Sequence, residues 1–148
     1  MRLSILGNLF QTFLKINRQP SLIPETIELH KASKQLELVY AHNQRFHLDA
    51  EYLRVHSPSA EVRGHHPDQA TLQVGKKNVG ILSVTAVGNY ALQINFDDNH
   101  NSGIYSWEYL HELCDKKENY WKIYLDKLTA DGGNRDPDVT VIQLFDPH

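Results

Sequence analysis

Short segments of hydrophobic residues, several of them alternating with polar ones, fill the first two thirds of the chain. ETIELH at residues 25–30 predicts a short strand, and QLELVYA and RFHLD alternate with a period of two on either side of HNQ, as in a hairpin. VGILSVTAV and YALQINF flank Gly88-Asn89, a dipeptide that favours a tight turn with positive φ. DDNHNSG then predicts a second tight reversal before IYS. The pattern therefore predicts a mostly antiparallel sheet.

Helical spacing replaces alternation in two places. AEYLRV at residues 50–55 predicts a short helix, opened by small and acidic residues. Ser106 is a suitable N-cap for a longer helical segment. The segment carries one apolar stripe at helical spacing, formed by Leu110, Cys114, Trp121, Leu125 and Leu128. The polar run DKKEN interrupts this stripe, so the segment forms either one helix or two. The expected fold class is α+β: a mostly antiparallel β-sheet with a short helix after the third strand and one or two C-terminal helices.

The chain divides into an N-terminal extension at 1–23, a domain at 24–128 and a tail at 129–148. The extension has Arg2, Lys15 and Arg18, no acidic residue, and apolar residues at helical spacing. Three interpretations stay open for it: a dispensable extension, an amphipathic docking helix, or an organelle-targeting segment. The tail contains VTVIQLF, a strand-like run suited to pairing with an exposed sheet edge.

Composition excludes several classes of protein. The 148 residues are 41% hydrophobic and 22% charged, as in an ordinary globular domain. A formal net charge of −3 gives no basic field for phosphate backbones, so nucleic acid is not an expected partner. No run approaches the roughly 20 apolar residues that a membrane span requires. The single cysteine, Cys114, excludes an internal disulfide and suits a reducing, cytoplasmic location, with targeting by the extension as the alternative.

Nine histidines raise the question of a metal site, because neutral imidazole is a common ligand of zinc and iron. The metal-ligand candidates lie in or beside predicted turns: His56, His65, His66, His100 and Asp98. The chain has no helical His-x-x-x-His pair around a glutamate and no Cys-x-x-Cys. Surface and turn histidines without a ligand are therefore the preferred interpretation, and no cofactor is assigned.

Other candidate motifs favour structural roles. The triplets His47-Leu48-Asp49 and His66-Pro67-Asp68 are typical of non-haem iron oxygenases, but the chain is too short for that fold with its own substrate pocket. Asp97 and Asp98 suit a tight turn as well as acid–base work. Cys114 lies on the apolar helix face and is expected to be inert packing. Since no nucleophile–base pair or cofactor motif is visible, the chain is not expected to be an enzyme.

Three long motifs carry a family resemblance: EYLRVHSPSAEVRGH, VGNYALQINFDD and DDNHNSGIYSWEYL. Together they resemble the gamma-butyrobetaine hydroxylase-like N-terminal domain family over about residues 24–128. In that family the domain occurs alone in small bacterial proteins, fused to Mrp-type iron–sulfur carrier ATPases, and at the front of gamma-butyrobetaine and trimethyllysine dioxygenases. The catalytic iron of those dioxygenases belongs to a separate downstream domain. The resemblance therefore implies a non-catalytic module.

The resemblance also implies that a zinc site has changed. In the hydroxylases a Cys-x-Cys-x-x-Cys segment shares zinc with a histidine, and the matching positions here are Ser57, Ser59, Val62 and His100. A neutral hydroxyl is a poor zinc ligand and valine is none. The preferred expectation is a metal-free corner held by serine hydrogen bonds and Pro58. The alternative is a weaker site rebuilt from nearby groups: His56, His65, His66, Asp98 and Glu61.

Two functions remain in view. The first is an accessory module that binds a protein partner, by analogy an iron–sulfur or metal-handling protein. Its expected contact residues are Arg63, His65, His66, Asp97 and Asp98. The second is a metal-binding protein that holds iron or zinc on His100 and nearby histidines.

Overall fold

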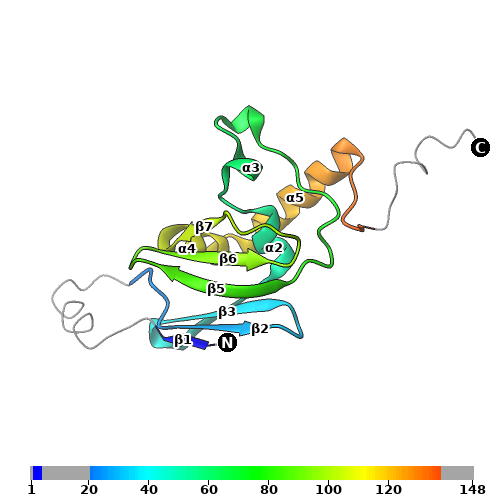
Figure 1. The fold of residues 1–148 in the computed structure, drawn as a ribbon. Helices are drawn as coiled ribbons and strands as arrows, with labels where there is room; N and C mark the ends of the chain where they lie inside the picture. The colour runs from blue at the N-terminus through cyan, green and yellow to red at the C-terminus, as the bar shows by residue number, and fades with distance from the viewer. Residues whose placement is uncertain (1, 5–20, 138–148) are drawn as a thin grey trace, which may run out of the picture.

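The computed structural model describes residues 2–4 and 21–137, and the α+β class is confirmed. The strands form two antiparallel sheets, ordered β1-β2-β3-β4 and β5-β6-β7, where a single sheet was expected. Residues 50–80 separate the last strand of the first sheet from the first strand of the second, and β5 pairs with β6 rather than with a strand of the first sheet. Figure 1 shows β5 beside β2 and β3, and α3 and α5 at the end farthest from β1.

The first sheet follows the predicted alternation. Its strands are β1 (Arg2–Ser4), β2 (Thr26–His30), β3 (Gln35–Tyr40) and β4 (Gln44–Asp49). Alternate side chains of β2, β3 and β4 enter the core: Ile27, Leu29, Leu36, Leu38, Tyr40 and Leu48. The positions between them carry mostly polar side chains on the opposite face, because successive residues of a strand point to opposite sides.

The second sheet contains the predicted hairpin. Its strands are β5 (Ile81–Val87), β6 (Ala91–Phe96) and β7 (Ile104–Ser106). Gly88 takes a φ of 52°, and the Tyr90 N–H donates to the Val87 carbonyl at 3.3 Å, so the tight turn is confirmed. The reversal between β6 and β7 contains Asn99 with a φ of 65°, a conformation that asparagine adopts more readily than most residues.

Four α-helices complete the fold within residues 2–4 and 21–137. The short helix α2 (Ala50–Val55) follows the third predicted strand, as expected, and a single-turn helix, α3 (Ala60–Arg63), interrupts the segment expected to be irregular. The apolar stripe divides into α4 (Trp107–Asp115) and α5 (Lys117–Asp131). Ser106 caps α4, since its hydroxyl accepts from the Tyr109 N–H at 3.2 Å. Gly132 ends α5 in the left-handed conformation typical of a C-cap.

One main hydrophobic core joins both sheets to α2 and α4. Two buried tyrosines tie these layers together through backbone carbonyls: the Tyr52 hydroxyl donates to Leu113 at 2.7 Å, and the Tyr105 hydroxyl donates to Leu53 at 2.6 Å. Cys114 is buried against the same core, and burial raises the pKa of its thiol to about 12. That pKa leaves almost no thiolate at neutral pH, as expected for an inert packing residue.

The ends of the chain bear on three predictions. Arg2–Ser4 forms a strand paired with β2, although helical spacing had suggested a helix there. Residues 5–20 and the strand-like run at 139–145 lie outside the described residues, so the proposals for the extension and the tail stay predictions. Helix α5 includes the first three residues of the predicted tail. Within 2–4 and 21–137, no helix is long and apolar enough to cross a membrane.

Candidate functional site

The end of α2 and the β6–β7 turn meet at a polar corner, formed by the buried residues Ser57, Ser59 and His100 and the exposed Glu61. Pro58 and the extended backbone of Ser59 lead the chain from α2 into α3. The Ser57 Oγ lies 2.7 Å from His100 Nε2, and the Ser59 Oγ lies 3.4 Å from the same atom. The side chains of Ser57, Ser59 and His100 are buried. Two of the three positions that the resemblance matches to hydroxylase cysteines, Ser57 and Ser59, therefore contact His100.

The other ring nitrogen of His100 faces an acid. His100 Nδ1 lies 3.3 Å from Glu61 Oε2, and Ser102 Oγ donates to the second Glu61 oxygen at 3.4 Å. Burial lowers the pKa of His100, and the nearby Arg54 charge lowers it further. The imidazole is therefore expected to be neutral at pH 7, with one nitrogen donating and the other accepting.

Ser57, His100 and Glu61 are thus ordered as in a nucleophile–base–acid triad, a set that the sequence pattern did not reveal. The environment of the Ser57 oxygen opposes that chemistry. Ser57 is 1% exposed, and the Ser59 N–H donates to its Oγ at 3.4 Å. A Cβ added at Gly103 would lie 2.5 Å from this oxygen. Gly103 and Ser59 therefore crowd the hydroxyl and restrict the approach of a substrate carbonyl.

An ion-pair cluster adjoins the polar corner. Asp98 Oδ2 accepts from Arg54 Nε at 2.9 Å and from Lys76 Nζ at 2.6 Å. Arg54 also donates to the Gln73 side chain at 3.1 Å. Lys76 is half-buried in this cluster. Asp98, predicted as a contact or metal-ligating residue, is thereby engaged inside the domain.

The remaining candidates of the sequence do not converge on His100. His65 and His66 are exposed on the loop after α3, and Asp97 is exposed in the β6–β7 turn. His56 faces the helices: its ring stacks on Tyr120 with a centroid distance of 5.9 Å, and its Nδ1 contacts the Tyr52 carbonyl. Among the described residues, no group of three potential ligand atoms gathers at His100.

A groove of about 520 Å³ runs between the polar corner and α5. We call it the tyrosine groove, after the side chains that shape it: His56, Arg63, Tyr109, Tyr120, Ile123 and Tyr124. The Arg63 guanidinium lies over the Tyr109 ring, 4.4 Å from its centroid. Ile123 is 43% exposed on the outer wall. The tyrosines were not among the predicted contact residues, although the spacing of Tyr120 and Tyr124 by four places both on one face of α5.

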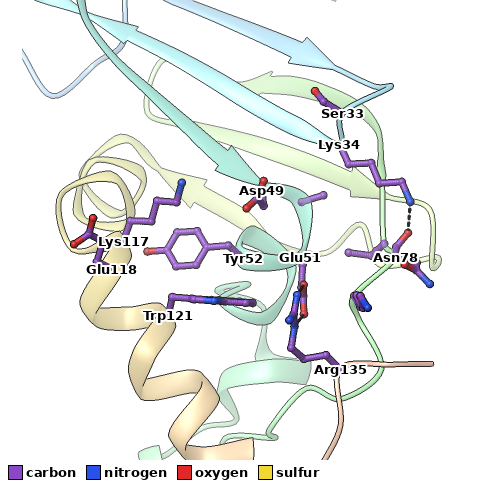
Figure 2. Close-up of a pocket in the computed structure, with 13 residues that line it drawn as sticks. Ser33, Lys34, Asp49, Glu51, Tyr52, Asn78, Lys117, Glu118, Trp121 and Arg135 are labelled. Carbon is purple, nitrogen blue, oxygen red and sulfur yellow. Dashed lines mark hydrogen bonds and ion pairs between the residues drawn. The ribbon is translucent and has the colours of Figure 1, made fainter. Parts of the chain in front are cut away.

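A second cleft, of about 460 Å³, opens where β4, α2 and α5 meet. This lysine cleft is shaped by Lys34, Lys77, Lys117, Glu51, Trp121 and Arg135. Figure 2 shows Arg135 beside Glu51, with Trp121 and Lys117 projecting from α5. Arg135 binds both oxygens of Glu51, at 2.7 and 2.8 Å, and Lys117 donates to the His47 carbonyl. Several of its charges are thus paired internally.

Comparisons with known proteins agree on one family. A family model described as gamma-butyrobetaine hydroxylase-like, N-terminal, matches residues 27–111. One solution NMR structure is 51% identical, with a TM-score of 0.70 over 83% of this chain and 97% of that one. Another is 43% identical, with a TM-score of 0.64 over 78% and 86%.

A crystal structure of a DUF971-family protein of unknown function from Acidithiobacillus ferrooxidans is 36% identical. Its TM-score is 0.52, and the alignment covers 64% of this chain and 96% of that one. No curated protein matches the chain. Since the family model spans more than half of the residues and two solved relatives exceed 40% identity over most of their length, the chain belongs to the gamma-butyrobetaine hydroxylase-like N-terminal domain family.

Proposed function

We propose that this domain is a non-catalytic binding module whose tyrosine groove holds a protein partner. The groove is the observation that carries the proposal. Tyrosine and arginine are enriched at the centres of protein interfaces, where they combine large contact area with a polar end. Here the hydroxyls of Tyr109 and Tyr124 already donate to backbone carbonyls, at 2.6 and 2.7 Å. Their rings are therefore held in position before a partner arrives, which reduces the entropy lost on binding.

The polar corner supports binding over catalysis. Ser57 has a base within hydrogen-bonding distance and borders the tyrosine groove, but its 1% exposure leaves a substrate little access to the hydroxyl. Catalysis by this serine would require a reacting atom about 3 Å from its oxygen, a position that Gly103 and Ser59 restrict. The serine–histidine contact accordingly acts as a structural hydrogen bond between α2 and the β6–β7 turn.

The class of partner follows from the family. In some members of this family the domain is fused to an iron–sulfur carrier ATPase, so by analogy an iron–sulfur or metal-handling protein is the expected partner of this chain. Arg63 lines the groove, and the exposed His65 and His66 follow it in the chain, so these three residues would supply polar contacts at its rim. The alternative, iron or zinc held on His100, depends on Glu61 as the one anionic group within 4 Å of the ring among the described residues.

Partner capture tests the binding proposal. The immobilised full chain is expected to retain one reproducible protein from an extract of the source organism, and the purified partner then serves for calorimetry. Ile123→Asp and Arg63→Glu are each expected to weaken binding at least tenfold, because hot-spot losses typically exceed about 1.4 kcal/mol. Lys34→Glu, on the rim of the lysine cleft, is the matched control and should bind as wild type. Equal binding by all three variants would remove the groove from the proposal.

A serine-directed phosphonate probe tests the non-catalytic part. Ser57 is expected to stay unmodified, since the probe needs the same access as a substrate. Intact mass spectrometry of the folded protein provides the measurement, and protein unfolded in denaturant, then probed, controls for reactivity of other hydroxyls. Stoichiometric labelling of Ser57 that disappears in His100→Ala would show an active nucleophile and overturn the proposal.

A further inference from the structure

Three neighbouring strands bring two histidines and a glutamate together on the polar face of the first sheet. His30 ends β2, Glu37 lies in β3, and His47 lies in β4. The register places Glu37 directly opposite His47. His30 is opposite Gln35, so it reaches Glu37 on the diagonal. Side chains at such cross-strand positions are close enough to interact.

The ligand atoms of the three side chains converge on one point. His30 Nε2 lies 2.8 Å from Glu37 Oε1, and His47 Nε2 lies 3.4 Å from the same oxygen. All three atoms lie within 4.8 Å of one another. The two imidazole rings are stacked, with centroids 6.3 Å apart and planes inclined by 29°. Both rings thus turn the same nitrogen toward one carboxylate oxygen.

The carboxylate of Glu37 is held in place. The Glu37 side chain is 10% exposed although it lies on the polar face, because its neighbours cover it. Arg45 Nη1 contacts its other oxygen, Oε2, at 2.5 Å, and Arg45 Nε donates to Asn43. This contact directs Oε1 toward the histidines, as an outer hydrogen bond directs a ligating carboxylate in metal sites.

We propose that His30, Glu37 and His47 form a binding site for a divalent transition-metal ion of the zinc class. Two imidazole nitrogens with one carboxylate oxygen are a donor set that zinc uses when a further position is left for water or another ligand. Tetrahedral bonds of the usual length separate ligand atoms by about 3.4 Å. The two imidazole nitrogens lie 2.8 and 3.4 Å from the Glu37 oxygen and within 4.8 Å of each other, so side-chain adjustments on the order of 1 Å would accommodate the ion. The His30 and His47 side chains are 35% and 47% exposed, which leaves the ion an entry path.

This site is separate from the proposed partner site and from His100. Figure 1 shows β2 and β3 at one end of the molecule and α3 and α5, which form the tyrosine groove, at the other. Loss of metal binding should therefore not affect partner capture, and loss of partner capture should not affect metal binding. In the sequence, His47 was a candidate only as the histidine of the triplet His47-Leu48-Asp49. Asp49, its companion there, instead accepts from Gln35 at 2.9 Å.

Titration of the untagged full chain with Zn²⁺, followed by calorimetry, tests the proposal, and Co²⁺ absorption reports the coordination geometry. One ion per chain is expected. His30→Asn, His47→Asn and Glu37→Gln should each weaken Zn²⁺ binding at least tenfold, because each removes one ligand of the same ion. Circular dichroism checks that every variant is folded, and the two histidine changes are at partly exposed positions where folding should survive.

Two histidine variants serve as matched controls. His42→Asn changes an exposed histidine on the turn between β3 and β4 and should bind Zn²⁺ as wild type. His100→Asn should also leave the affinity unchanged, which separates this site from a metal at the polar corner. Absence of saturable binding of either ion by the wild type would overturn the proposal. So would binding that survives the double change His30→Asn with His47→Asn.

Discussion

Replacing Asp98 with alanine is expected to lower the free energy of unfolding by about 3 kcal/mol, because it leaves a buried guanidinium without its counter-charge. The Arg54 side chain is 8% exposed, and Asp98 Oδ2 is its only carboxylate partner among the described residues. After the substitution Arg54 keeps the neutral Gln73 oxygen at 3.1 Å. The half-buried Lys76 loses the same carboxylate. Urea unfolding of the two proteins at pH 7 measures the difference.

Asp97→Ala is the matched control, since it removes an exposed acid from the same turn and should change stability by less than about 0.5 kcal/mol. Equal effects at the two positions would contradict the assignment of Asp98 to the ion-pair cluster. The difference between Asp98→Ala and wild type should also depend on pH. Burial alone would raise the pKa of Asp98, but the Lys76 hydrogen bond and the Arg54 charge together hold that pKa below its usual value.

The sign of this dependence follows from linkage. A carboxyl whose pKa is lower in the folded state adds stability above its unfolded pKa, about 3.9 for aspartate, and that contribution disappears as the pH falls through the folded value. Wild type and Asp98→Ala should therefore converge in stability below about pH 4. A difference that stays constant from neutral to strongly acidic pH would mean that the charge of Asp98 contributes nothing.

The fold was predictable where a periodic pattern decided it. Alternation in QLELVYA and RFHLD put Leu36, Leu38 and Leu48 in the core, and the Ser106 cap was visible from residue type alone. The division into two sheets was not predictable, because alternation shows which face of a strand is buried but not which strand it pairs with. The strand at Arg2–Ser4 was hidden for a related reason: three residues are too few for a period to appear.

The polar corner was predictable only through the family resemblance. Ser57 and His100 are 43 residues apart, and no spacing rule joins them. The resemblance identified both positions, but Glu61 and the crowding at Gly103 depend on the backbone path of α3 and the β6–β7 turn. The cluster of His30, Glu37 and His47 carried a partial signal. Alternation predicts that these three side chains lie on the polar face of the sheet. The register that brings them into contact depends on the two turns that connect the strands.

Changing Ser57, Ser59 and Val62 together to cysteine is expected to create a zinc site at the polar corner, with His100 as the fourth ligand. The Ser57 and Ser59 oxygens already lie 2.7 and 3.4 Å from His100 Nε2. Val62 follows Ser59 by three residues, nearly one turn of α3, and is buried. Three thiolates and an imidazole form a closed structural zinc set, the one that the resemblance to the hydroxylases implies for these positions.

Zinc should then stabilise the triple variant and not the wild-type corner. A ligand present at about 1,000 times its dissociation constant adds about 4 kcal/mol to the free energy of unfolding. The triple variant is made together with His30→Asn and His47→Asn, so that the proposed site on the first sheet does not contribute, and it is compared with that double variant alone. Its thermal midpoint should accordingly rise with zinc and fall again with chelator, while Co²⁺ should give the strong absorption of cobalt–thiolate bonds. Adding His100→Ala to the triple variant provides the control and should lower its affinity for the metal, since one of four ligands is lost. If the triple variant takes up no zinc in the His30→Asn, His47→Asn background, the backbone of this corner differs from that of a metal site, and its serines are more than replacements for lost thiolates. If it does take up zinc, the backbone has kept the geometry of a metal site, and only the side chains decide whether hydrogen bonds or a metal connect α2 to the β6–β7 turn.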